Sequence, residues 1–217
     1  MKRRQFSLLA TAAMGSSVLG FTSGAQAQGA TPQPGVDYQV IERRVSTEAP
    51  AGKIEVVEFF WYNCGHCNGF EPMLAAWAQK LPKDVVLRRV PIAFQDSFAP
   101  QQRLFYAIEA MGLLARLHEK IFNAIHVQRQ KLDTVEAISE WVALQGVDKA
   151  KFQEQYNSFS VASKVTKATQ LQNSYRIEGV PALGVAGRFI TDGSMARRMD
   201  RALLVVDYLV KEIRAGR

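Results

Sequence analysis

Residues 54–67 have the sequence IEVVEFFWYNCGHC, and this stretch decides the fold. Its first seven residues are rich in β-branched and aromatic side chains, which predicts a central strand over 54–60. The stretch ends with Cys64 and Cys67, the only two cysteines of the 217-residue chain, and a helical pattern follows. A Cys-x-x-Cys pair between a strand and a helix is typical of a redox-active site.

The residues after the cysteines complete a βαβ unit. Apolar residues recur there at helical spacing and form one face of a predicted helix: Phe70, Met73, Leu74, Trp77 and Leu81. Pro82 ends this pattern, and residues 85–92 form the next predicted strand. A strand, a helix and a strand in this order imply a parallel pair of strands.

Strand signals are absent from residue 97 to about residue 175, where five helices are predicted. Their starts or apolar stripes lie at Pro100, around Leu114, at Asp133, at Asp148 and over 161–175. For the third of these helices, Asp133 with Glu136 three residues later suggests a capping box. The chain therefore contains a long helical block after the βαβ unit.

Strand signals return after the helical block. Residues 182–190 predict two short strands around a turn at Ala186-Gly187, and residues 191–194 predict a loop. A last helix carries apolar residues from Met199 to Ile213, and a first short strand is expected over 38–45.

This order of elements predicts an α/β fold in which a helical insertion divides a sheet domain. We expect a flexible lead-in at 28–36, the first part of the sheet domain at 37–96, the insertion at 97–165 and the second part at 166–217.

The first 27 residues have the features of a secretory signal peptide. Three basic residues are followed by an interrupted apolar stretch over 6–21, and Ala25-Gln26-Ala27 fits cleavage after Ala27. A membrane anchor is the alternative, but the apolar stretch is too short and too interrupted to span a bilayer comfortably. Arg3-Arg4-Gln5-Phe6 resembles a twin-arginine signal, which leaves both export routes open.

Charge and composition exclude some function classes. The formal net charge is +7, of which Lys2, Arg3 and Arg4 supply three, so the mature chain carries +4. No Lys/Arg-rich run with interleaved aromatic residues follows residue 27, and nucleic acid is not an expected partner. An exported protein meets an oxidising compartment, in which a disulfide persists. We therefore expect a bacterial periplasmic protein.

The expected position of Cys64 at the start of a helix favours its thiolate, the form that attacks a disulfide. Unpaired backbone N–H groups and the helix dipole stabilise a negative charge there. His66 adds to this effect as a cation or a hydrogen-bond donor. A stabilised thiolate stabilises the reduced form, so the disulfide is a strong oxidant. Cys67 lies one turn further along, where it is placed to resolve a mixed disulfide.

Three other interpretations of the cysteine pair stay open. A structural disulfide is one, although a four-residue ring gains little stability from loop closure. A metal site needs about four ligands, but His118 and His126 lie about 12 Å apart on a helix; we expect no metal and take both for ordinary helix residues. Two inert core thiols are the third, which Gly65 and His66 do not suit.

Residues 58–67, EFFWYNCGHC, with Phe70-Glu71 after them, resemble the active-site segment of the periplasmic DsbA-type thiol:disulfide oxidoreductases. Gly179-Val180-Pro181-Ala182 resembles the cis-proline loop of that family, about 115 residues after the cysteines. The resemblance covers essentially the whole mature chain. It implies a thioredoxin fold with an inserted all-helical domain.

The resemblance also implies roles for individual residues. Cys64 would attack and Cys67 would resolve, as partners in a redox-active Cys64–Cys67 disulfide. Val180 and Pro181 would face this pair and bind an extended substrate strand. Glu58 resembles the family's buried acid beneath the disulfide, which has a raised pKa and assists proton transfer to Cys67.

Plainer interpretations stand beside these roles. Glu58 would otherwise be an acid on a solvated strand face, and Pro181 an ordinary proline at a strand entry. Glu71 and Arg89 would either join Glu58 in a charged cluster or form a surface salt bridge.

The function that these observations predict is the donation of a disulfide to reduced, unfolded exported proteins by a monomer. The resemblance implies a membrane quinone-linked reoxidase of DsbB type as a second partner, and it implies no organic cofactor. Gly65 departs from the family, whose bacterial prototype usually has proline there, and this leaves the oxidising strength open. A disulfide isomerase or reductase, a glutathione transferase of kappa type and a non-catalytic binding module are the alternatives.

Overall fold

The computed structural model describes residues 31–217, so the predicted signal peptide at 1–27 lies outside the described residues. The elements, in chain order, are β1 (Gln39–Val40), β2 (Ile54–Phe60), α1 (Gly65–Ala78), β3 (Val85–Pro91), a 3-10 turn η1 (Asp96–Phe98), α2 (Ala99–Ala110), α3 (Leu114–His126), α4 (Val135–Leu144), α5 (Lys149–Tyr156), α6 (Phe159–Ser174), β4 (Ala182–Val185), β5 (Phe189–Asp192) and α7 (Met199–Arg214).

The described strands form one mixed sheet in the order β1-β5-β4-β2-β3. β2 pairs with β3 in parallel, as the predicted βαβ unit requires, and Glu58 lies opposite Arg89 in this pair. β4 pairs with β2 in the antiparallel direction, so that the start of β4 lies beside the end of β2. This arrangement brings the residue before β4 to the same edge of the sheet as the residues after β2.

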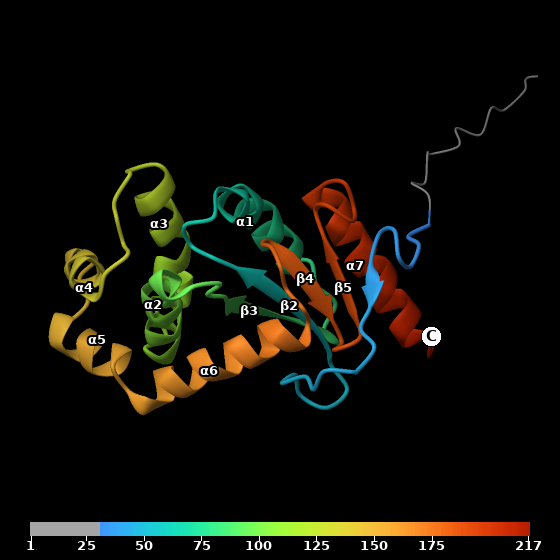
Figure 1. Ribbon diagram of the computed structural model, residues 1–217, viewed down its shortest axis with the longest axis horizontal. Coiled ribbons are helices and arrows are strands. Elements are labelled where there is room, and N and C mark those ends of the chain that lie inside the picture. Colours follow the sequence, from blue (N-terminus) through green and yellow to red (C-terminus); the bar gives the residue numbers. More distant parts are fainter. Residues whose placement is uncertain (1–30) are drawn as a thin grey trace, which may run out of the picture. The chain divides into compact units, whose positions relative to one another are not determined.

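Two hydrophobic clusters cover the two faces of the sheet. On one face, Val56 and Leu183 pack with residues of α1 and α7. On the other face, Val57 and Phe59 pack with the helical block, and the Phe59 ring lies 5.1 Å from the ring of Tyr175. In Figure 1, α2 to α5 gather at one end of the sheet, and α6 runs back from them toward β2 and β4. The structure is the predicted α/β thioredoxin fold with a helical insertion.

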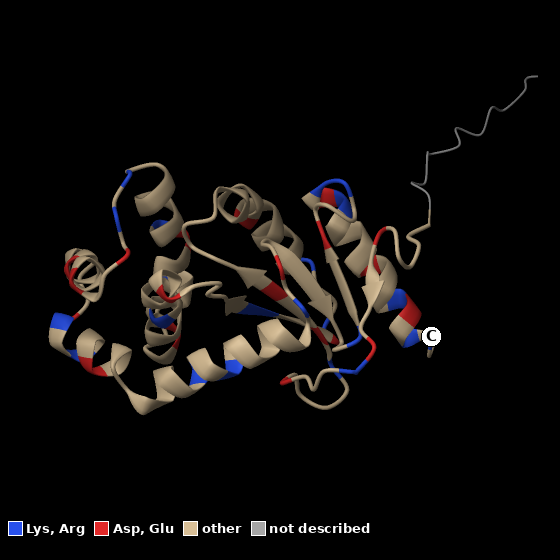
Figure 2. Ribbon diagram, in the orientation of Figure 1, with Lys and Arg blue, Asp and Glu red and all other residues tan. Residues whose placement is uncertain are grey.

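The central strands carry charged residues on both β2 and β3, which Figure 2 shows in red and blue. Glu55 and Glu58 on β2 are both buried. Arg88 Nε donates to Glu55 at 3.0 Å, and Arg89 Nε lies 3.2 Å from Glu58. Central parallel strands are normally almost entirely apolar. The four ionisable residues on β2 and β3 therefore indicate that this pair of strands has a functional role.

Three sequence-based expectations are corrected. β1 ends at Val40 and is shorter than the predicted strand over 38–45. Its partner β5 begins only at Phe189, so the residues after Val40 lie beside the turn that precedes β5. Thr191 and Asp192 belong to β5 and not to a loop, because they pair with β4. The N-cap of α4 is Thr134 and not Asp133, because the Thr134 Oγ1 accepts the Ala137 N–H at 3.2 Å.

Other expectations are confirmed. Asp148 caps α5 by accepting the Lys151 N–H at 2.9 Å. The turn between β4 and β5 contains Ala186 and Gly187, both with positive φ, as a type I′ hairpin requires. α6 spans Phe159–Ser174, as the apolar stripe over 161–175 predicted. No helix within residues 31–217 is both long and apolar enough to cross a membrane.

Both the backbone conformation and the close neighbours of residue 187 require a glycine at this position. Its φ is +67°, and an added Cβ would collide with the carbonyl oxygen of Val45. Gly52 has a similar φ of +79° but has no heavy atom within 4 Å of an added Cβ. We expect Gly187→Ala to destabilise the fold by about 2–4 kcal/mol and Gly52→Ala by about 1–2 kcal/mol. Equal losses in urea unfolding would contradict the close approach of Val45.

Candidate active site

The loop after β2 places Cys64 as the N-cap residue of α1. Its backbone is extended, with φ −83° and ψ 116°, and its Sγ accepts a hydrogen bond from the Cys67 backbone N–H at 3.2 Å. The Cys64 N–H in turn donates to the Trp61 carbonyl at 3.0 Å, which closes the loop. Cys64 is partly exposed, Cys67 is fully buried, and both are free thiols.

The two cysteines differ in acidity. The Cys67 thiol, as a hydrogen-bond donor, is the largest influence on Cys64; with the backbone N–H groups of Cys67 and His66 and the charge of His66, it lowers the pKa of Cys64 to about 6 against the opposing effect of burial. Burial raises the pKa of Cys67, and the neighbouring Cys64 sulfur raises it further. At neutral pH the pair therefore holds one thiolate at Cys64 and one thiol at Cys67.

The predicted cis-proline loop lies beside the thiolate. The Val180–Pro181 peptide bond is cis, and the Val180 carbonyl oxygen is 3.6 Å from the Cys64 Sγ. Pro181 directly precedes β4, whose first residue Ala182 pairs with Phe59 near the end of β2. The sheet thus brings together two motifs that are far apart in the sequence.

A cavity of about 380 Å³ opens next to this loop. Its lining includes His66, Val180, Pro181, Asp192, Arg197 and Met199. The lining combines apolar side chains with charged side chains of both signs.

Glu58 lies in β2 beneath the cysteine pair and is fully buried. Burial, with the negative charge of Glu71 as the next cause, raises the pKa of Glu58 to about 8, although Arg89 opposes this shift. No described residue donates a well-directed hydrogen bond to either Glu58 oxygen. Glu58 is therefore protonated at neutral pH, and it is not an acid on a solvated strand face.

The charged cluster proposed from the sequence is present. Arg89 reaches Glu58 through Nε and donates through Nη2 to Glu71 Oε1 at 2.5 Å. Glu71 is buried on α1, one turn after Cys67. The Glu71–Arg89 pair is therefore internal and is not a surface salt bridge.

His118 is the functional-site residue that the sequence interpretation missed. It was expected to be an ordinary helix residue, but it is buried, and its Nε2 lies 3.4 Å from Glu71 Oε2. Its Nδ1 lies 2.8 Å from the Tyr62 hydroxyl, two residues before Cys64. A signal did exist, because His118 falls between Leu114, Leu117 and Ile121 on the apolar face of its helix.

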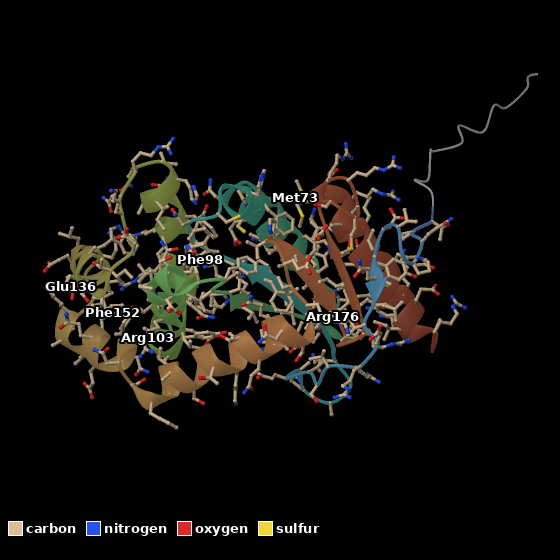
Figure 3. The ribbon with its side chains drawn as sticks, viewed as in Figure 1. Met73, Phe98, Arg103, Glu136, Phe152 and Arg176 are labelled. Carbon is tan, nitrogen blue, oxygen red and sulfur yellow. The ribbon has the colours of Figure 1, made fainter. Side chains whose placement is uncertain are left out.

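The loop between β2 and Cys64 is also held from the helical insertion. His126 Nε2 lies 2.8 Å from the Tyr62 carbonyl oxygen. The Trp61 ring stacks on the ring of Phe98, labelled in Figure 3, with centroids 3.5 Å apart.

Within residues 31–217, no group of three or more His, Cys, Asp or Glu side chains is arranged to hold a metal ion.

An accessible thiolate and a buried thiol can take up or give away a disulfide by exchange with a second protein. The sheet order, the insertion and the cis-proline loop belong to the thioredoxin fold. Fold and site together define the class as a thiol:disulfide oxidoreductase.

Comparison with known proteins identifies the family. Residues 55–203 match the family model described as a DSBA-like thioredoxin domain. The chain is 43% identical to the thiol:disulfide interchange protein DsbA of Burkholderia cepacia, over 90% of this chain and 92% of that one. It is 44% identical to that of Bordetella pertussis, over 95% of this chain and 96% of that one.

Solved structures agree with these sequence relatives. The crystal structure of Pseudomonas aeruginosa DsbA matches with a TM-score of 0.80 at 38% identity, over 84% of this chain and 94% of that chain. The chain belongs to the DsbA family.

Glu58 gives a pH-dependent prediction. Its pKa is about 8 in the fold and about 4.5 when unfolded, so its contribution to stability is complete below pH 4.5 and is lost as pH rises to 8. Glu58→Gln removes this loss. Between pH 4.5 and pH 8, we expect the free energy of unfolding of the variant to gain about 4 kcal/mol relative to that of the wild type.

Urea unfolding of the reduced proteins across this pH range measures the difference. Glu154→Gln, on the exposed side of α5, is the matched control and should follow the wild type. A stability difference for Glu58→Gln that does not change with pH would show that Glu58 is already ionised at neutral pH.

Proposed function

We propose that this protein donates its Cys64–Cys67 disulfide to reduced, unfolded exported proteins. The observation that carries the proposal is the asymmetry of the pair, with a partly exposed Cys64 of low pKa and a buried Cys67 of raised pKa. Such a pair stabilises the reduced form, and its disulfide is therefore a strong oxidant.

The transfer has two steps. A client thiolate attacks the Cys64 Sγ, the Cys64–Cys67 bond breaks, and Cys67 leaves with the electron pair and takes up a proton. A second client thiolate then attacks the client sulfur of the mixed disulfide, and Cys64 leaves as a thiolate. The client has lost two electrons, and the cysteine pair of the protein has gained them.

Glu58 is suited to supply the proton that Cys67 needs. The Cys67 sulfur is buried, so bulk water does not reach it directly. Glu58 is protonated at neutral pH, and its charge and that of Cys67 influence one another. A buried acid with a pKa near the working pH is an effective proton donor and acceptor.

The client is proposed to lie along the cis-proline loop. The Val180 backbone would pair with an extended client strand, Pro181 would face the disulfide, and His66 would flank the client at the cavity. Gly65 and His66 lie between the cysteines and tune the redox balance. An added Cβ at Gly65 meets no heavy atom within 4 Å, so glycine is not imposed there by crowding.

The remaining parts of the proposal concern partners and processing. Reoxidation by a membrane quinone-linked protein of DsbB type fits the DsbA family, and we propose that the protein acts as a monomer. The proposed division is a lead-in at 28–36, a sheet domain at 37–96 and 166–217, and a helical insertion at 97–165. An isomerase, a reductase or a binding module remains the alternative.

Replacement of single cysteines tests the central step. Cys67→Ser should accumulate a mixed disulfide with a client that already carries a disulfide, because the Cys64 thiolate attacks that disulfide and no Cys67 thiol is present to release the client. Cys64→Ser should accumulate none and should lose disulfide transfer by about 10³-fold or more. Non-reducing electrophoresis and intact mass measure both. A mixed disulfide formed equally well by Cys64→Ser would reverse the proposed roles, and unchanged transfer would favour the binding module.

The site of export cleavage is tested separately. Cleavage after Ala27 predicts that the protein recovered from the periplasm begins at Gln28. Intact mass and N-terminal sequencing decide this, and an uncleaved chain retained in the membrane fraction would support the membrane anchor.

A further inference from the structure

A continuous series of buried polar contacts links the active-site loop to the acid beneath the disulfide. The Tyr62 hydroxyl contacts His118 Nδ1, and His118 Nε2 faces Glu71 Oε2. Glu71 Oε1 accepts from Arg89, whose Nε faces Glu58. Apart from Tyr62 in the loop, each residue of the series comes from a different element: His118 from α3, Glu71 from α1, Arg89 from β3 and Glu58 from β2. Of these elements, α3 belongs to the helical insertion (Figure 1).

The proton positions in this series follow from the chemistry of its ends. Burial raises the pKa of Tyr62 well above its ordinary value, so Tyr62 keeps its proton and donates it to His118 Nδ1. Burial also lowers the pKa of His118, so its ring is neutral at pH 7. With Nδ1 as the acceptor, the one ring proton sits on Nε2, which lies 3.4 Å from Glu71 Oε2 without a well-directed hydrogen bond.

Glu71 is ionised for this reason, although it is buried. Burial alone would raise its pKa, but the approach of the His118 N–H is the largest of the influences that lower it at neutral pH, and the charge and hydrogen bond of Arg89 add to it. Glu58 has no comparable donor and faces the same guanidinium. Two carboxyls therefore share one arginine, but only Glu71 accepts a directed hydrogen bond from it, and only Glu71 also has the His118 imidazole 3.4 Å from its second oxygen.

We propose that His118 is a positioning residue that keeps the single negative charge of the Glu58–Glu71 pair on Glu71, away from the two cysteines. A charge on Glu58 would oppose the Cys64 thiolate, because Glu58 interacts electrostatically with both cysteines, whereas Glu71 is not among the main influences on either. By holding the charge one turn along α1, His118 leaves Glu58 protonated and the thiolate stable. The proposal rests on the proposed function only in assuming that the thiolate of Cys64 matters for exchange.

The surroundings of His118 contain no other charged group that could do the same. The rings of Phe60, Phe105 and Phe122 pack against the imidazole from β2, α2 and α3. The described charged or titratable groups that act on it are Tyr62, Glu71, Arg89 and Glu119, and Glu119 lies on the exposed side of α3.

The test is a set of four variants whose Cys64 thiolate is titrated by ultraviolet absorbance. His118→Phe keeps the aromatic packing and removes both nitrogens, whereas His118→Gln keeps a donor and an acceptor. Glu71→Gln removes the charge itself. His126→Phe is the matched control, because it loosens the same loop at the Tyr62 carbonyl but contacts neither carboxyl.

We expect His118→Phe and Glu71→Gln each to raise the proton affinity of Cys64 by about three- to tenfold. The equilibrium with glutathione should shift by a similar factor toward the oxidised protein, since the thiolate is less stable. His118→Gln should restore most of the wild-type titration, and His126→Phe should leave it within about twofold of the wild type. In the Glu71→Gln background, His118→Phe should add no further change.

Two outcomes would overturn the proposal. Unchanged Cys64 titration in His118→Phe, with only a lower melting temperature, would mean that His118 merely packs. A full additional shift in the Glu71→Gln background would mean that His118 does not act through Glu71. Neither readout uses a client protein, so a failure of client oxidation is distinguished from a failure of this proposal.

Discussion

The hydrogen bond from the Cys67 backbone N–H to the Cys64 Sγ connects the redox chemistry to the first turn of a helix. A helix N-terminus has backbone N–H groups without intrahelical partners, and here a sulfur takes the place that a serine or aspartate oxygen usually fills. The same bond that starts α1 therefore stabilises the thiolate. A change in the position of α1 would therefore also change the acidity of Cys64 and the burial of Cys67.

Buried charge beneath this helix works against stability. Glu58 is placed in a central strand where an apolar residue would be better for folding, and its nearest cation is shared with Glu71. The arrangement is favourable only when one of the two carboxyls carries a proton, because two buried carboxylates beside one guanidinium leave an unbalanced charge. Because two carboxyls share one guanidinium, one of them keeps its proton, and that proton lies near Cys67.

The local parts of this architecture were predictable from the sequence, because strand and helix periods and the Cys-x-x-Cys spacing are local patterns. Val180 and Pro181 could be assigned only through resemblance, since the approach of β4 to β2 is not visible in either segment. His118 was misjudged because its partners, Tyr62 and Glu71, come from distant segments and meet it only when α3 packs against α1. The predicted length of β1 was wrong for a similar reason, since that length depends on where β5 begins.

The helical insertion is a structural part of the active site and does more than cover the sheet. Tyr62 is held at its hydroxyl and at its carbonyl by two histidines of α3, two helical turns apart. His118 and His126 are too far apart along α3 to share a metal ion, but each reaches a different polar group of Tyr62. A rigid Tyr62 fixes the entry to the N-cap residue Cys64. The active-site loop therefore depends on packing between the sheet and the insertion, and a thioredoxin sheet without these helices would lack both contacts.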